Sequence, residues 1–222
     1  MSSVQGTNRP PPMRPFLVLL ACLFALTFAL GNRHQFSSIA SRWNKEGQGS
    51  NDSDLNHSVS KQPWVIRGLG KYNDHDVERA QRIIQQHLRV GARIAPAQAP
   101  TESCYQSNGK FLEASTCLDQ MRMSGERTIY ITRQKIQDGE TALRGFTRMH
   151  GHVVVVKSNA HFRHTILHEI GHTYGLAHCT DKRCLMAIHN DSEETGRFCN
   201  RCIKLLPKEE FVDLKSLAMQ SE

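Results

Sequence analysis

The chain has 222 residues, of which 39% are hydrophobic and 22% charged, so it can form a packed core and is not globally disordered. This length fits one domain with additional segments. The formal net charge is +7, but lysine and arginine are scattered among acidic residues, which indicates an ordinary solvated surface. The sequence has no pattern typical of a nucleic-acid-binding module, so nucleic acid is not an expected partner.

Residues 1–31 are predicted to be a signal peptide or an N-terminal membrane anchor. Arg9 and Arg14 lie in a proline-rich leader, and the apolar run from Phe16 to Leu30 is interrupted only by Thr27. A positive leader before such a run is typical of a secretory signal. The run is slightly shorter than the ~20 residues that span a bilayer, and both a cleaved signal and an uncleaved anchor stay open. Either one predicts export, as a secreted protein or as one attached to a membrane through residues 16–30.

Residues 32–61 are polar, without apolar periodicity, which predicts a flexible linker before a folded domain over residues 62–222. Within the domain, apolar residues at helical spacing predict a helix over 74–88, and four consecutive valines predict a buried strand over 153–156. Strands and helices alternate, which predicts an α/β (α+β) fold with a mixed sheet. The expected elements are strands over 64–69, 92–95, 128–132, 142–149 and 153–156, helices over 74–88, 110–121 and 160–174, and a C-terminal helix that starts at Pro207 and buries Phe211, Leu214 and Leu217.

Residues 168–178 read His-Glu-Ile-Gly-His-Thr-Tyr-Gly-Leu-Ala-His. His168 and His172 are four residues apart on the predicted helix, so both imidazoles lie on one face and can bind one ion. A catalytic zinc ion keeps one position for water and needs a third protein ligand, for which His178 is the candidate. A continuing helix would carry His178 ~9 Å along the axis and onto another face. Gly175 is therefore predicted to end the helix in a left-handed conformation and turn the chain back.

Glu169, next to the first histidine, is predicted to be the catalytic base. A zinc ion lowers the pKa of its bound water and polarises a carbonyl, while the carboxylate takes the proton and passes it to the leaving amine. The pattern predicts a zinc metallopeptidase that acts on peptide or protein substrates. The alternative is a catalytically weak zinc-binding module tethered at a membrane, but the intact glutamate favours the enzyme. His164 lies ~12 Å of helical rise from His172, too far to share the ion.

The seven cysteines suggest a second metal site. Four of them follow the histidines in two pairs, Cys179-x4-Cys184 and Cys199-x2-Cys202. Four thiolates are the closed ligand set of a structural zinc, which predicts two zinc ions per chain. Two disulfides, or a redox pair at Cys199 and Cys202, are the alternatives. Cys104 and Cys117 could pair in an oxidising compartment or stay unpaired.

The run His-Glu-x-x-His-x-x-Gly-x-x-His-Cys, then x4-Cys-x-Met and Cys-x-x-Cys, resembles the archaemetzincin family over residues 168–202. The order of strands and helices from Trp64 onward also resembles a metzincin domain. The resemblance implies zinc peptidase activity, a zincin-like fold, and Met186 as the methionine under the catalytic zinc. By analogy, the 142–149 segment would form the sheet edge above the cleft, where a peptide backbone could bind. The spacer before Cys199 is several residues shorter than the family pattern.

Overall fold

The computed structural model describes residues 62–105, 109–121, 125–188 and 196–218. The predicted signal or anchor segment and the predicted linker therefore lie outside the described residues. None of the helices within these ranges combines the length and the apolar character that crossing a bilayer requires.

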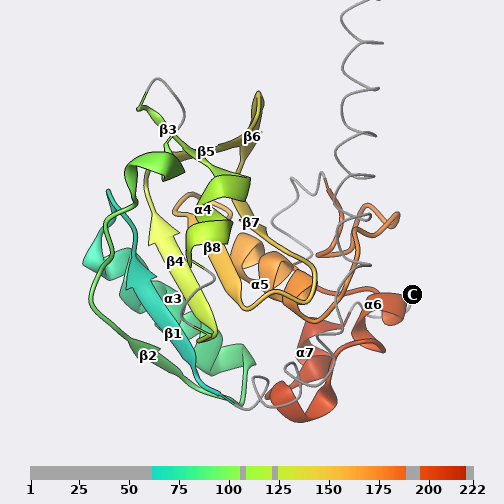
Figure 1. Ribbon diagram of the computed structural model, residues 1–222. Helices are drawn as coiled ribbons and strands as arrows, with labels where there is room; N and C mark the ends of the chain where they lie inside the picture. Colours follow the sequence, from blue (N-terminus) through green and yellow to red (C-terminus); the bar gives the residue numbers. More distant parts are fainter. Residues whose placement is uncertain (1–61, 106–108, 122–124, 189–195, 219–222) are drawn as a thin grey trace, which may run out of the picture. The chain divides into compact units, whose positions relative to one another are not determined.

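A five-stranded mixed sheet forms the main sheet of the described region (Figure 1). Its strands stand in the order β2 (Ala92–Ile94), β1 (Trp64–Gly68), β4 (Thr128–Thr132), β8 (Val153–Lys157) and β7 (Gly145–Thr147). The first four pair in parallel, whereas β7 runs antiparallel to β8 at the edge. The valines of β8 are at most 4% exposed, as expected for a strand covered on both faces. The predicted mixed α/β fold is confirmed.

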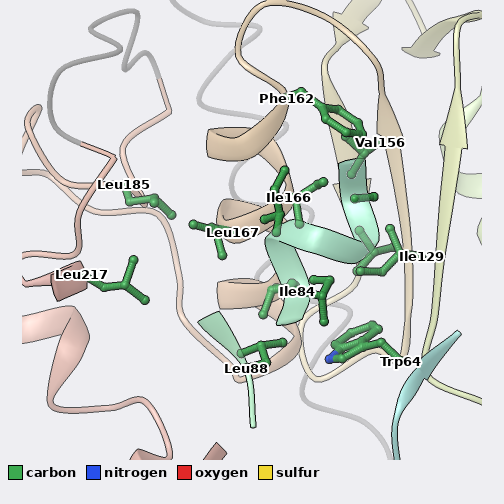
Figure 2. Packing of buried hydrophobic residues seen from close by; sticks show 14 of the residues in the cluster. Trp64, Ile84, Leu88, Ile129, Val156, Phe162, Ile166, Leu167, Leu185 and Leu217 are labelled. Atoms are coloured by element: carbon green, nitrogen blue, oxygen red, sulfur yellow. The ribbon is translucent and has the colours of Figure 1, made fainter. Parts of the chain in front are cut away.

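Two helices, α3 (Asp74–His87) and α5 (Phe162–Thr173), share the main hydrophobic core with the sheet. Ile84 of α3 and Ile166 of α5 pack with Ile129 of β4 (Figure 2). Asn73 caps α3 by accepting the His75 N–H, which satisfies one of the free donors of the first turn. The core therefore holds α5 against a buried strand, and α5 carries the predicted zinc-binding histidines.

The segment predicted as one helix over 110–121 is divided, and that prediction was wrong in its first half. Strand β3 (Phe111–Glu113) precedes the shorter helix α4 (Ala114–Met121). β3 pairs with β5 (Lys135–Asp138), which turns back into β6 (Thr141–Leu143) and completes a second, three-stranded sheet. The predicted 142–149 strand is likewise split between β6 and β7. Leu112 and Ile136 are almost fully buried, so pairing with residues distant in the sequence decided the structure of these segments.

The predicted single C-terminal helix is also wrong. The chain forms α6 (Asn200–Ile203), a 3₁₀ turn η4 (Lys208–Glu210) and α7 (Leu214–Leu217). Phe211 stays extended because it pairs with Leu88 in an antiparallel bridge. Asp213 then caps α7 by accepting the Lys215 N–H, which starts a new helix. Phe211 and Leu217 are buried as predicted, whereas Leu214 is half-buried.

Candidate metal centre

Helix α5 presents His168 and His172 side by side. Their Nε2 atoms are 3.1 Å apart. Nδ1 of His168 lies 2.7 Å from the Leu185 carbonyl oxygen, and Nδ1 of His172 lies 2.7 Å from that of Leu176. A carbonyl oxygen only accepts hydrogen bonds, so each Nδ1 carries the proton and each Nε2 presents a lone pair. This is the tautomer that binds a metal ion through Nε2.

The chain reverses directly after α5 at Gly175. The Leu176 N–H donates to the Gly171 carbonyl oxygen at 3.0 Å and the Gly175 N–H to that of His172 at 2.9 Å, the two bonds of a Schellman motif. Gly175 has a φ of 84°, the left-handed conformation that the sequence argument requires. The reversal brings the His178 ring to 4.7 Å from that of His172.

The three histidines form one potential ligand set. Their ligand atoms lie within 4.8 Å of one another. Two Nε2 atoms bound to one tetrahedral zinc lie about 3.3 Å apart, close to the separation between His168 and His172. Burial, with the nearby His178, lowers the pKa of His172 to about 4, and burial lowers the pKa of His168 well below its usual value. Both rings are therefore neutral at pH 7, as zinc binding requires.

Glu169 lies beside this cluster and is only 6% exposed. Burial raises the pKa of its carboxyl to about 8. A divalent cation on the histidines would favour the carboxylate and oppose this shift, because opposite charges stabilise each other in a buried setting. Glu169 is not a member of the histidine cluster, which agrees with a role as a base rather than as a ligand.

Gly145 is a site residue that the sequence analysis missed. A Cβ atom at this position of β7 would lie 2.7 Å from Thr165 Cγ2 and 3.0 Å from Glu169 Cγ. The edge strand can thus approach the catalytic helix closely only because residue 145 has no side chain. The available signal was an isolated glycine inside a strand pattern, which often marks close backbone approach.

Met186 packs against α5 between the two helical histidines. A Cβ atom at Gly171 would lie 2.5 Å from the Met186 Sδ, and Met186 is fully buried. Its carbonyl oxygen accepts the Cys179 N–H at 2.8 Å, while the preceding Leu185 carbonyl orients His168. The segment that contains Met186 therefore packs against the helix that carries the histidines and orients one of them.

The four downstream cysteines form a second cluster, with all four Sγ atoms within 4.8 Å of one another. None of the four forms a disulfide bond, and the Sγ atoms of Cys179 and Cys199 are 3.7 Å apart. Sulfurs on one tetrahedral zinc lie about 3.8 Å apart, whereas a disulfide bond is about 2.05 Å long. The Cys199 N–H also donates to the Cys184 Sγ at 3.3 Å. This geometry fits a metal site and not two disulfides.

Three other residues considered from the sequence lie outside both clusters. The His164 ring stacks on that of His168, with centroids 6.1 Å apart, so it lies beside a candidate ligand without joining the set. Cys104 and Cys117 are neighbouring buried free thiols, and the Cys117 thiol donates to the Cys104 carbonyl oxygen at 3.5 Å.

The helix carries a His-Glu-x-x-His pattern, the reversal returns a third histidine, and a methionine packs against Gly171 of the same helix. In a mixed α/β fold, these features are those of a metzincin-type zinc metallopeptidase. Comparison with known proteins shows which family the chain is similar to. The model of Peptidase family M54 matches residues 125–208, a range that contains both clusters. The chain is similar to the archaemetzincins, and this similarity together with the site identifies it as a zinc metallopeptidase.

Individual proteins show the same similarity. Archaemetzincin from Methanopyrus kandleri is 28% identical over 152 residues, which cover 60% of this chain and 86% of that protein. Archaemetzincin from Methanocaldococcus jannaschii is 43% identical over 44 residues, 18% of this chain and 25% of the relative. Crystal structures of archaemetzincins from M. kandleri and Archaeoglobus fulgidus share the fold, with TM-scores of 0.53 and 0.52 at 22% and 19% identity. They cover 65% and 64% of this chain, and 93% and 99% of their own chains.

Gly175→Val should remove metal from the histidine cluster and abolish activity without changing any ligand. Valine resists a positive φ, and its Cβ would lie 2.2 Å from the His150 ring. His178→Ala should give the same phenotype, whereas the cysteine cluster keeps its metal in both variants. Metal stoichiometry beside far-UV circular dichroism checks this.

Gly91→Val is the matched control, because Gly91 also has a positive φ but would place its Cβ in open space. If Gly175→Val retains its full metal content and activity, the reversal does not create the site.

Proposed function

We propose that the chain hydrolyses peptide bonds at a zinc ion held by His168, His172 and His178, with Glu169 as general base. The observation that carries the proposal is the pair of helical imidazoles, whose Nδ1 atoms are engaged by backbone carbonyls and whose Nε2 atoms converge. When bound there, zinc would supply an activated water and polarise the substrate carbonyl. A site of three imidazoles leaves a coordination position open, as catalytic zinc sites do.

The chain's own residues supply the proton transfer. Glu169 accepts a proton as the attacking water adds to the carbonyl carbon, and it passes that proton to the nitrogen of the leaving amine as the C–N bond breaks. Its burial beside β7 suits this role, because a carboxyl that is shielded from bulk water keeps the accepted proton for the leaving amine. Among the described strands β7 pairs with β8 alone, so an extended substrate backbone could add to its outer edge.

The alternative function is a catalytically weak zinc-binding module tethered at a membrane. Metal storage requires ligands but no base. Glu169 lies outside the ligand set and is 6% exposed, so metal storage has no use for this buried carboxyl, and its presence favours the peptidase.

Glu169→Gln should abolish peptide hydrolysis while the metal content stays unchanged, because the amide cannot accept the proton but no ligand is lost. The rate should fall by at least about a hundredfold, the lower range of general base contributions. Cleavage of a peptide library and zinc content, measured on the same preparation, test this. Glu78→Gln, on the exposed surface of α3, serves as the control. Loss of zinc from Glu169→Gln would refute the assigned role.

We further propose that Cys179, Cys184, Cys199 and Cys202 hold a second, structural zinc, which gives two zinc ions per chain. The spacing of the sulfurs supports this stoichiometry. Cys179 directly follows His178, so a metal at the cysteine cluster would tie the end of the reversal to the C-terminal residues and stabilise both.

Cys199→Ser should therefore lower zinc from two ions towards one and lower the melting temperature, since a structural zinc contributes folding free energy. Cys117→Ala, which removes a buried thiol outside the cluster, should keep both ions. A wild-type protein with one zinc and no reactive thiols among the four cysteines after denaturation would favour the disulfides instead.

We also propose export of the chain. The proposal rests on the sequence alone, on the apolar run from Phe16 to Leu30 behind a positive leader. N-terminal sequencing of protein from fractionated native cells tests it. A mature end near Gly31 in the exported fraction indicates a cleaved signal, and an intact end in the membrane fraction indicates an anchor. An intact end in the cytoplasmic fraction contradicts export.

A further inference from the structure

Three polar side chains form a closed network inside the domain. Arg127 Nη1 donates to Glu210 Oε2 at 2.9 Å, and Arg127 Nη2 donates to the Tyr174 hydroxyl at 2.7 Å. The Tyr174 hydroxyl in turn donates to the same carboxylate oxygen of Glu210. The side chains of Arg127 and Glu210 are 5% and 9% exposed, and the guanidinium lies 4.4 Å from the centroid of the Trp64 ring. The network thus joins residues that are far apart in the sequence.

Packing alone does not explain such a network. Burying an ion pair costs desolvation free energy, and apolar side chains of similar volume often stabilise a core equally well. An ion pair that also binds a hydroxyl restricts geometry, because all three hydrogen bonds form together only when the three side chains are in one relative position.

Tyr174 lies where the path of the backbone decides whether His178 reaches the other two histidines. It is the C-cap residue of α5, between His172 and Gly175. Its N–H is shared between the carbonyl oxygens of Ile170 and Gly171, so its backbone is the first part of the reversal that returns His178. A side chain fixed at the hydroxyl end therefore restrains the start of that turn.

Glu210 is itself held by backbone bonds. Residues 210–212, here called the C-terminal strap, lie against the end of α3. The Arg89 N–H donates to the Glu210 carbonyl oxygen at 2.7 Å, and the Val212 N–H donates to that of His87 at 3.0 Å. Arg89 Nε also donates to the Phe211 carbonyl oxygen at 2.6 Å. The carboxylate is thus presented to Tyr174 from a well-anchored segment.

We propose that Arg127 and Glu210 are positioning residues that hold the Tyr174 hydroxyl, and through it the reversal that delivers His178 to the metal. The C-terminal strap is then part of the active-site scaffold, although it contributes no ligand. The inference rests on the proposed function, because it assumes that His178 binds the catalytic zinc.

The test compares Tyr174→Phe with Tyr130→Phe. Tyr174→Phe removes one hydroxyl but keeps the ring, which packs 5.6 Å from that of Phe211, and it leaves the Arg127–Glu210 ion pair in place. Tyr130→Phe is the matched control, since its buried hydroxyl donates to Gln98 at 2.8 Å outside the network. Zinc-loaded full-length proteins are mixed with a chromophoric chelator, and the release of each zinc is followed in time together with kcat and KM.

Tyr174→Phe should speed zinc release from the histidine site by about tenfold, the effect of one hydrogen bond to a charged group. It should lower kcat several-fold with KM unchanged, and it should leave the cysteine-bound zinc unaffected. Glu210→Gln should act in the same direction with a larger loss of thermal stability, because it removes the negative charge that pairs with the buried Arg127 guanidinium. Tyr130→Phe should change neither release rate.

If Tyr174→Phe lowers only the melting temperature, as Tyr130→Phe would, the network is structural packing and the inference is wrong. If wild-type protein releases no zinc that depends on His178, the proposed function fails instead. Comparison of wild type with His178→Ala in the same chelator assay separates these two failures.

Discussion

The arrangement of the candidate site depends on one backbone reversal, in which Gly175 adopts a positive φ after α5. Two histidines one turn apart arise from any helix with the right spacing, but a third ligand from the same segment needs the chain to return towards the helix. The two Schellman hydrogen bonds fix the turn, and the Leu176 carbonyl inside it also orients His172. The same few residues therefore end the helix, bring His178 back and select the tautomer of a neighbouring ligand.

The surrounding structure holds this reversal from several sides. Met186 fills the space left by Gly171, and the edge strand approaches Glu169 over Gly145. After the turn, His178 belongs to the histidine cluster and the next residue, Cys179, belongs to the cysteine cluster. The two clusters are consecutive in the sequence at residues 178 and 179, so a metal in the second would restrain the chain that carries the third histidine of the first.

The sequence predicted the parts whose signals are local. Helix α3 has a strong apolar period and acidic residues in its first turn, β8 is a run of valines, and the histidine and cysteine spacings are short. Strands β3 and β5 were missed because each has three or four residues and is stabilised by pairing with distant residues. The prediction of a single C-terminal helix was wrong for a similar reason, because Phe211 pairs with Leu88, which is distant in the sequence. Arg127, Tyr174 and Glu210 had no sequence signal, because each alone resembles an ordinary polar residue.

The most direct test of the account is a crystal structure of the zinc-loaded protein with anomalous diffraction measured on both sides of the zinc absorption edge. Two zinc peaks are expected. One should lie among the Nε2 atoms of His168, His172 and His178, with the chain reversed at Gly175, and the other among the four cysteine sulfurs. A peak bound only by His168 and His172, with His178 directed elsewhere, would show that the reversal does not assemble the catalytic site.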